Sequence, residues 1–246
     1  MHKDRTLTPD FGVVPYGSAL RPWFGETASH NTVSLGGKSQ AEHTGRCQRF
    51  EQTAATTYVW LQSDAAYAGC KLNRHLLLTS DFLLDWFEVS LTTEDSQSIE
   101  WWMHPVIAPQ SKQLVELTFA DKTSYPPIHI QPNVPELPIV GRFSPEAWNV
   151  HLTYPLLDGV QICQSSLVLP NQELLTIRTP GDSVDPSVTY TGLLHRQTGK
   201  YANFIHVYRA GDDVRLGHFA EDHIDITFDG RKVTVQLLSE QGLLIV

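Results

Sequence analysis

The fold class is decided by one stretch, IDITFDGRKVTVQL, residues 224–237. Apolar and polar residues alternate on both sides of Asp229-Gly230, which is typical of half-buried β-strands because successive side chains point to opposite faces of a sheet. Asp-Gly between two such runs is a strong hairpin signal, since the tight turn needs positive φ angles. The stretch therefore predicts two antiparallel strands joined by a two-residue turn.

The same period-two pattern recurs along the rest of the chain, and convincing helical periodicity is scarce. The other alternating runs are residues 57–61, 114–119, 160–164, 173–177 and 203–208. Glycine-containing turn signals lie at residues 36–37, 158–159, 181–182 and 211–213. The sequence therefore predicts an all-β protein.

Two apolar runs, residues 76–78 and 82–87, are continuous rather than alternating. Strands that are covered on both faces give this pattern. We therefore expect a large antiparallel β-sandwich of stacked sheets. A sandwich of 246 residues can form one domain, so residues 1–246 are predicted to be a single domain.

Residues 125–145 are different, because prolines exclude a regular strand or helix through most of the segment. The prolines are Pro126, Pro127, Pro132, Pro135, Pro138 and Pro145. The segment is either a long loop over one face or a linker between sub-domains. The similar strand patterns on both sides favour the loop.

Charge and hydropathy argue against two classes of partner. The formal net charge is −9, which would repel nucleic acid or a sulfated glycan at long range unless a local basic patch overcame the field. No apolar stretch reaches the roughly 18–20 residues that a membrane helix needs, so no membrane span is expected.

Three cysteines, Cys47, Cys70 and Cys163, show no Cys-x-x-Cys spacing, which argues against a thiolate zinc ribbon. Cys163 lies in an apolar alternation and is expected to be a buried small hydrophobic residue. A bridge between Cys47 and Cys70 stays open as an alternative.

Asp10, Tyr16 and His30 lie in a turn-rich N-terminal segment, and turns are where a β scaffold usually presents reactive side chains. Such a group is either a functional site or a polar corner whose members satisfy one another. The spacing alone favours the polar corner.

An ordered series of motifs adds to this interpretation. The series begins in the N-terminal segment with Asp10-x-Gly12, Tyr16, residues 29–33 (Ser-His-Asn-Thr-Val) and residues 36–40 (Gly-Gly-Lys-Ser-Gln). It continues with residues 74–78, 82–85, 101–104 (Trp-Trp-Met-His), 192–199 and 204–208. From about residue 2 to residue 210, the series resembles the β-sheet domain of heparinase II/III-type polysaccharide lyases.

The resemblance implies a set of site residues. In that family, two histidines and the aspartate of Asp-x-Gly hold zinc, which corresponds here to His2, Asp10 and His30. Tyr16 corresponds to a tyrosine that faces the substrate, and Arg21, Trp23 and Gln40 are predicted to bind substrate. The alternative is that Asp10 caps a turn, that His30 bonds to a backbone carbonyl, and that Tyr16 is half-buried beside Pro15.

The resemblance also implies a function. Lyases of this family cleave uronate-containing glycans by β-elimination, which needs a base, an acid and neutralisation of the uronate carboxylate. An upstream α-helical toroid supplies their second tyrosine and an asparagine or histidine, and this toroid is not among the 246 residues. We therefore expect the chain alone to be inactive. If it belongs to an exported lyase, a periplasmic or secreted location is expected.

Two other functions stay open: a module that binds an acidic glycan without cleaving it, and a structural domain. Whether the chain is an enzyme by itself is therefore uncertain from the sequence. Tryptophans could stack on sugar rings, although six in a sandwich of this size are more often core residues. Trp23 and Trp148 are expected to be the most exposed of them.

Overall fold

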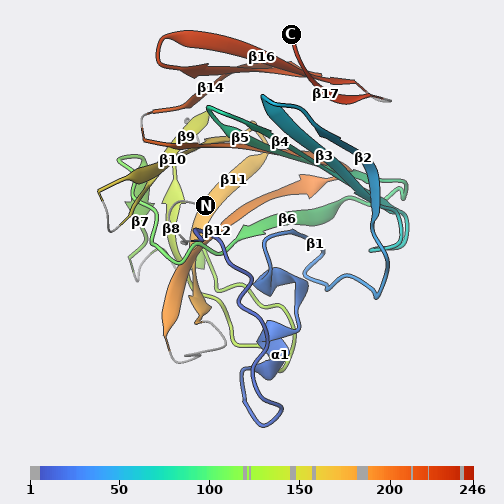
Figure 1. The fold of residues 1–246 in the computed structure, drawn as a ribbon. Coiled ribbons are helices and arrows are strands. Elements are labelled where there is room, and N and C mark those ends of the chain that lie inside the picture. The colour runs from blue at the N-terminus through green and yellow to red at the C-terminus, as the bar shows by residue number, and fades with distance from the viewer. Residues whose placement is uncertain are drawn as a thin grey trace. The chain divides into compact units, whose positions relative to one another are not determined.

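The structure is a computed structural model that describes residues 6–118, 121, 123–144, 148–156, 159–181, 188–211, 213–220, 222–238 and 241–246. Its elements are two short helices and seventeen strands within these residues (Figure 1). They are α1 (Arg21–Phe24), the 3₁₀ helix η1 (Thr27–Ser29), β1 (Val33–Leu35), β2 (Arg46–Gln52), β3 (Thr56–Ser63), β4 (Cys70–Thr79), β5 (Leu83–Leu91), β6 (Gln97–Met103), β7 (Leu114–Glu116), β8 (Ile139–Phe143), β9 (Asn149–Pro155), β10 (Gln161–Leu167), β11 (Gln172–Pro180), β12 (Thr189–Gly199), β13 (Tyr201–Ala210), β14 (Arg215–Ala220), β15 (His223–Phe228), β16 (Arg231–Leu238) and β17 (Gly242–Ile245).

The strands form three sheets in which the paired strands run antiparallel. The prediction of an all-β fold with stacked antiparallel sheets is confirmed. The chain divides into two compact units, and each unit collects three separate stretches of sequence. The prediction that residues 1–246 form one domain is not tested by this division and stays a prediction.

The first unit comprises residues 1–40, 96–146 and 170–199. Its six-stranded sheet has the order β1-β6-β12-β11-β8-β7. One core of this unit joins Trp102, Leu175, Ile177 and Leu194 of the sheet to Trp23 and Phe24 of α1 and to the segment around Phe11. The N-terminal segment and α1 are therefore anchored by apolar burial, which is the main stabilising term in folding.

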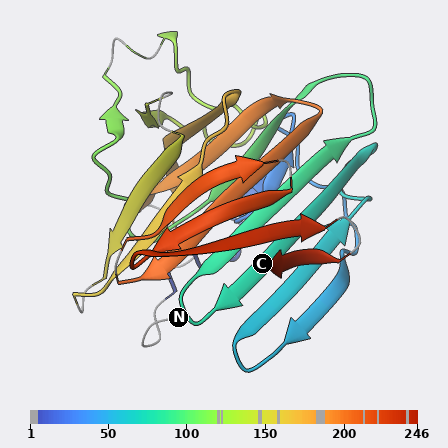
Figure 2. The ribbon, with the colours of Figure 1, turned by 90° about the horizontal axis from the view of Figure 1, so that it is seen from above.

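The second unit comprises residues 41–95, 147–169 and 200–246. It contains a seven-stranded sheet, β2-β3-β4-β5-β13-β10-β9, and a four-stranded sheet, β14-β15-β16-β17. Within this unit the smaller sheet lies over the larger one (Figures 1 and 2). Their shared core includes Trp86 and Ile205 from the larger sheet and Ile224, Ile226 and Val235 from the smaller one.

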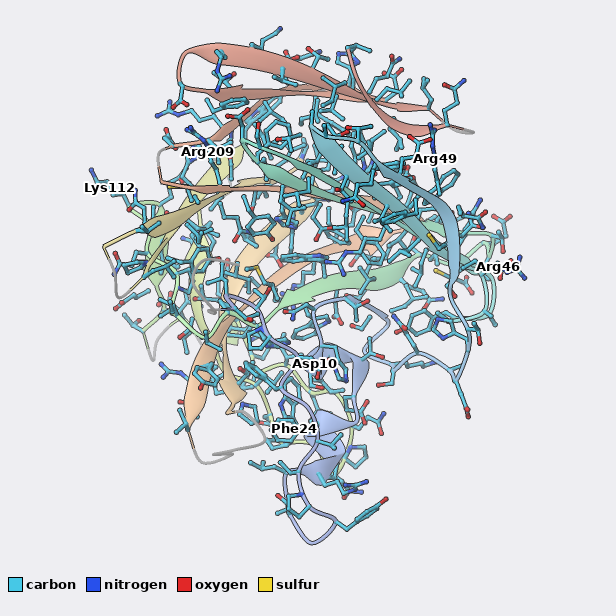
Figure 3. All side chains as sticks on the ribbon, viewed as in Figure 1. Asp10, Phe24, Arg46, Arg49, Lys112 and Arg209 are labelled. Carbon is cyan, nitrogen blue, oxygen red and sulfur yellow. The ribbon has the colours of Figure 1, made fainter. Side chains whose placement is uncertain are left out.

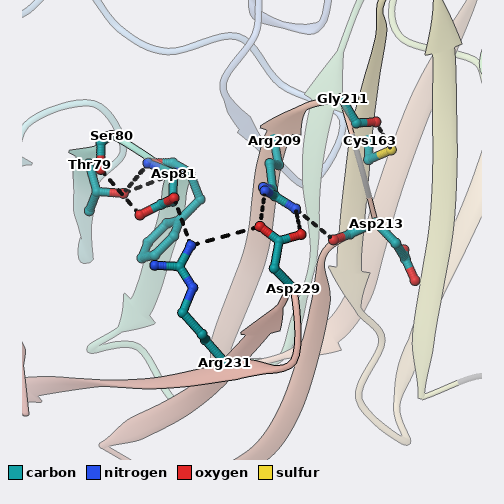
Figure 4. A network of polar contacts seen from close by, with 10 residues as sticks. Thr79, Ser80, Asp81, Cys163, Arg209, Gly211, Asp213, Asp229 and Arg231 are labelled. Carbon is teal, nitrogen blue, oxygen red and sulfur yellow. Dashed lines mark hydrogen bonds and ion pairs between the residues drawn. The ribbon is translucent and has the colours of Figure 1, made fainter.

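The hairpin that the opening stretch predicts is present as β15 and β16, with Phe228 opposite Arg231. Its turn residues have positive φ angles, 49° at Asp229 and 70° at Gly230. Side chains around this turn tie it to β13 and to the turn between β4 and β5 in the same unit (Figure 4). Arg209 bonds to both carboxylate oxygens of Asp229, and Arg231 bonds to Asp81 at 3.0 Å.

Two expectations about elements differ from the structure. The alternating run 114–119 gives only a short strand, β7 (Leu114–Glu116), and Phe119 lies outside the described residues. The predicted loop 125–145 contains β8 at its C-terminal end. The five residues of β8 alternate between buried and half-buried and follow Pro138, so that this proline does not interrupt the pairing.

The three cysteines are free thiols, so the alternative of a bridge between Cys47 and Cys70 is wrong. Cys163 is buried as predicted. Among the described residues, no helix has the length and apolar character needed to cross a membrane.

Candidate functional site

Asp10 and His30 lie side by side in the first unit, 20 residues apart in the sequence. The Nδ1 of His30 is 2.8 Å from the Oδ2 of Asp10. A carboxylate only accepts hydrogen bonds, so this contact places the imidazole proton on Nδ1. The His30 side chain is 36% exposed and the Asp10 side chain is 64% exposed, so the pair is open to solvent. Figure 3 labels Asp10 on the N-terminal segment that precedes α1.

The second carboxylate oxygen of Asp10 accepts the main-chain N–H of Gly12 at 2.8 Å, which closes a tight turn. Gly12 has a φ of 70°, a conformation that favours glycine. Burial alone would raise the pKa of Asp10, but the N–H of Gly12 and the hydrogen bond and charge of His30 together lower that pKa. Asp10 is therefore an ionised oxygen donor at neutral pH.

The segments that carry these two side chains are joined through Asn31. Its side-chain oxygen accepts the main-chain N–H of His104 at 2.8 Å. Its side-chain nitrogen donates to the carbonyls of Thr8 and Pro9 at 3.4 and 3.3 Å. Sequence reasoning missed this role, although the position of Asn31 between His30 and a strand was a signal for it.

Tyr16 is 88% exposed, so the alternative of a half-buried ring beside Pro15 is wrong. The guanidinium carbon of Arg21 lies 3.7 Å above the centroid of the Tyr16 ring, a cation–π contact. One guanidinium nitrogen of Arg21 also donates to the carbonyl of Val14 at 2.8 Å. The structure thus presents an exposed phenol with a positive charge beside it.

Trp23 is fully buried, so the expectation that it is exposed is wrong. The four residues of α1 turn Trp23 and Phe24 into the core of the first unit. Trp23 cannot stack on a sugar ring from this position. Trp148, the other tryptophan expected at the surface, is 65% exposed.

Gln40 belongs to a polar network that fastens the loop after β1. Its side-chain nitrogen donates to the carbonyl of Val33 at 3.1 Å, and its main-chain N–H donates to the hydroxyl of Thr27 at 2.8 Å. The hydroxyl of Ser39 donates to Glu26 in the same network. A role of Gln40 in substrate binding stays a prediction.

Nitrogen and ionised oxygen donors suit zinc, and the pair of Asp10 and His30 offers one of each. Within the part of the chain that the structure describes, no group of three or more histidine, cysteine, aspartate or glutamate residues could hold a metal ion. His2, the third predicted ligand, lies outside the described residues. Of the alternative roles, Asp10 does cap a turn, whereas the ring of His30 contacts Asp10 instead of a backbone carbonyl.

Comparisons with known proteins agree with this fold. The heparan sulfate lyase HepC from Pedobacter heparinus superposes with a TM-score of 0.67 at 14% identity, over 98% of this chain and 34% of that chain. A heparinase III structure superposes with a TM-score of 0.63 at 16% identity, over 95% of this chain and 34% of that chain. At these identities the likeness concerns the fold alone, and the chain spans about a third of the length of these lyases.

No curated protein sequence matches the chain. A family model described as "Heparinase II/III-like, C-terminal" matches residues 1–200. The match covers most of the sequence and includes the described part of the Asp10 and His30 site. The chain therefore belongs to the heparinase II/III-like C-terminal family.

Proposed function

We propose that the chain is the β-sheet part of a polysaccharide lyase that cleaves uronate-containing acidic glycans by β-elimination. The observation that carries this proposal is the family match over residues 1–200, which spans Asp10, Tyr16 and His30. The solved structures with the same fold include proteins described as heparan sulfate lyase and heparinase III. The exposed Tyr16 beside Arg21 is the feature that suits the chemistry.

In the elimination, a base removes the C5 proton of the uronate, and the electron pair of that bond forms the double bond between C4 and C5. The bond from C4 to the leaving oxygen breaks, and the oxygen takes up a proton. In our proposal the phenol of Tyr16 carries one of these two protons, because it is solvent-accessible. The positive charge of Arg21, which lies over the Tyr16 ring, would attract and bind the negatively charged substrate beside this phenol.

Zinc is part of the proposal as an ion held by Asp10, His30 and His2. The lowered pKa of Asp10 fits this role, because a ligating carboxylate has to be ionised. When bound, the ion would supply a fixed positive charge that orients the two segments. The test is metal analysis of the dialysed chain: about one zinc per chain is expected, with loss of zinc in His30→Ala. A chain that keeps no zinc would refute this part.

We also propose that the chain is inactive by itself, since it spans about a third of the lyases with this fold. A second catalytic tyrosine and a residue that neutralises the carboxylate would come from a preceding helical toroid. A site that lacks one member of a catalytic group loses most of its rate. The test is the ultraviolet absorbance of unsaturated uronate after the isolated chain is incubated with alginate or glycosaminoglycans. No signal is expected, and a robust signal would refute this part of the proposal.

The contact of Arg21 with Tyr16 also favours a second candidate, a module that binds the glycan without cleaving it. Calorimetry with uronate oligosaccharides and the isolated chain tests this candidate. Arg21→Met is expected to abolish the binding heat. Lys112→Met removes the same charge from another exposed position of the first unit (Figure 3) and should leave the heat unchanged. Equal losses in both variants would mean non-specific charge attraction.

A further inference from the structure

His104, directly after β6, is fully buried within the first unit and is surrounded by aromatic rings. The ring of Trp102 stacks on it with centroids 6.5 Å apart and planes at 9°. Trp23 meets it edge-on at 5.9 Å, and Phe11 lies tilted at 5.9 Å. These contacts leave the imidazole a single orientation, because buried rings in such packing do not change rotamer freely.

One nitrogen of this imidazole makes a specific hydrogen bond. Nε2–H donates to the main-chain carbonyl of Ala28 at 2.8 Å, which leaves Nδ1 with its lone pair. Nδ1 is buried and has no hydrogen-bond partner among the described residues. Burial lowers the pKa of His104 to about 4, so the ring is neutral at neutral pH.

An apolar ring would fill the same space without leaving a buried nitrogen unsatisfied, which is unfavourable. The hydrogen bond to Ala28 is therefore what the imidazole contributes beyond packing. Ala28 belongs to η1, which ends one residue before His30. The bond thus fixes the backbone from which the His30 side chain projects.

The same residue also holds the segment of Asp10. Phe11, the next residue after Asp10, packs against the His104 ring. The main-chain N–H of His104 donates to the side chain of Asn31, which in turn bonds to the carbonyl of Pro9. Both neighbours of Asp10 are therefore connected to His104, one directly and one through Asn31.

We infer that His104 is the positioning residue of the Asp10 and His30 pair, and that its Nε2–H bond to Ala28 holds His30 in register with the Asp10 carboxylate. The relevance of this inference to catalysis rests on the proposed function. The geometric claim can be tested without substrate or metal.

The experiment records long-range proton–nitrogen correlation spectra of the metal-free chain labelled with ¹⁵N-histidine at neutral pH. His30→Gln assigns the His30 signals by removing them. In the unmodified chain, His30 should carry its proton on Nδ1, as its bond to Asp10 requires. His104→Phe keeps a packed ring but loses the donor, and the Nδ1–H tautomer of His30 should be lost in favour of the Nε2–H tautomer.

The matched control is His195→Phe. His195 is a buried histidine of β12 in the same sheet, and its Nε2 lies 2.9 Å from the side-chain oxygen of Gln172. This variant should leave the His30 tautomer unchanged. An unchanged tautomer in folded His104→Phe, or an equal change in His195→Phe, would overturn the inference.

If His104→Phe does not fold, His104→Gln and His104→Met decide. They have similar size, but only glutamine can donate to the Ala28 carbonyl. The inference requires His30 to keep its Nδ1–H tautomer in the glutamine variant and to lose it in the methionine variant. The same tautomer in both would overturn it. If the His30 tautomer does not respond to His104, the lyase proposal still stands. If the protein proves not to be a lyase, the tautomer result still stands.

Discussion

Arg74 on β4 and Asp85 on β5 form a two-pronged ion pair, with Nε–Oδ1 and Nη2–Oδ2 distances of 3.0 and 2.7 Å. Only 25% of the Arg74 side chain and 5% of the Asp85 side chain are exposed. Burial alone would lower the pKa of Arg74, but the charge and hydrogen bonds of Asp85 raise it. Arg74 is therefore held in its charged form by the carboxylate beside it.

Asp85→Asn removes the paired carboxylate from a largely buried guanidinium, and we expect it to lower the free energy of unfolding by about 3 kcal/mol. Urea denaturation of the two proteins measures the difference. The control is Asp213→Asn, which removes the carboxylate of an exposed pair with Arg215 and should change stability by less than about 1 kcal/mol. Equal losses of stability in Asp85→Asn and Asp213→Asn would show that burial does not make the loss of a paired carboxylate more costly.

His206 on β13 gives a pH dependence. Its ring is fully buried and lies 2.9 Å from the hydroxyl of Ser166. Burial, with a smaller contribution from the charge of Arg74, lowers its pKa to about 3 from the ordinary value of 6.5. The unfolded chain therefore binds a proton that the folded chain does not bind between these two pH values.

The contribution of His206 to stability is therefore fully present above pH 6.5 and falls as the pH drops from 6.5 towards 3, by at most about 1.4 kcal/mol per pH unit. Urea denaturation at pH 7 and pH 5 measures the fall, and His206→Gln should make it smaller. His218→Gln, at an exposed position of β14, should leave it unchanged. A fall of the same size in His206→Gln would contradict the prediction.

The sequence predicted single residues well where a local motif or a family resemblance determined them. Asp10 and His30 were predicted to be neighbours, and the structure places them 2.8 Å apart. The burial of Trp23 could not be predicted, because it depends on contacts with Phe11 and His104, which come from other parts of the chain. Prolines near Trp23 indicate an exposed loop, and only the contacts with Phe11 and His104 show that the Trp23 side chain is buried.

The β15–β16 hairpin is the element that the sequence predicted most directly, because Asp229-Gly230 specifies the turn without help from distant residues. β8 is the opposite case. Its alternating run is short, and the prolines around it indicate a loop over residues 125–145. Pairing with β11 and β7 makes it a strand, and no local signal encodes that pairing.

Gly230→Ala tests the turn. A Cβ at this position would have no atom within 4 Å, so the φ of 70° is the only source of strain. We expect a loss of about 1 kcal/mol in the free energy of unfolding. Gly45→Ala is the control, since its Cβ would make an ordinary contact of 3.7 Å with the Gln62 carbonyl and its φ is not positive. A loss in Gly45→Ala as large as that in Gly230→Ala would contradict the explanation.

For the whole molecule, the composition and strand patterns predicted an all-β fold, but not which strands are neighbours. β13 shows why. It pairs with β5 on one side and with β10 on the other, and both partners lie well before it in the chain. Such non-local pairing is decided by burial in the finished fold.

The family match ends at residue 200, one residue before β13 begins. A fragment of residues 1–200 would lack β13, so β5 and β10 would each lose a partner in the middle of the seven-stranded sheet. We expect this fragment to lack fixed tertiary packing. Near-ultraviolet circular dichroism and the cooperativity of urea unfolding measure this, with residues 1–246 as reference. A native-like spectrum with cooperative unfolding would contradict the expectation.

The alternation of the chain between its two units has a consequence for biosynthesis. Each unit takes three stretches of sequence, and the last stretch of the first unit ends at residue 199. During translation, neither unit can be completed before at least this residue has left the ribosome. Strands whose partners come later in the chain, such as β5 before β13, are thus exposed until then, a state prone to aggregation. For the same reason, recombination between genes cannot transfer either unit as one uninterrupted block.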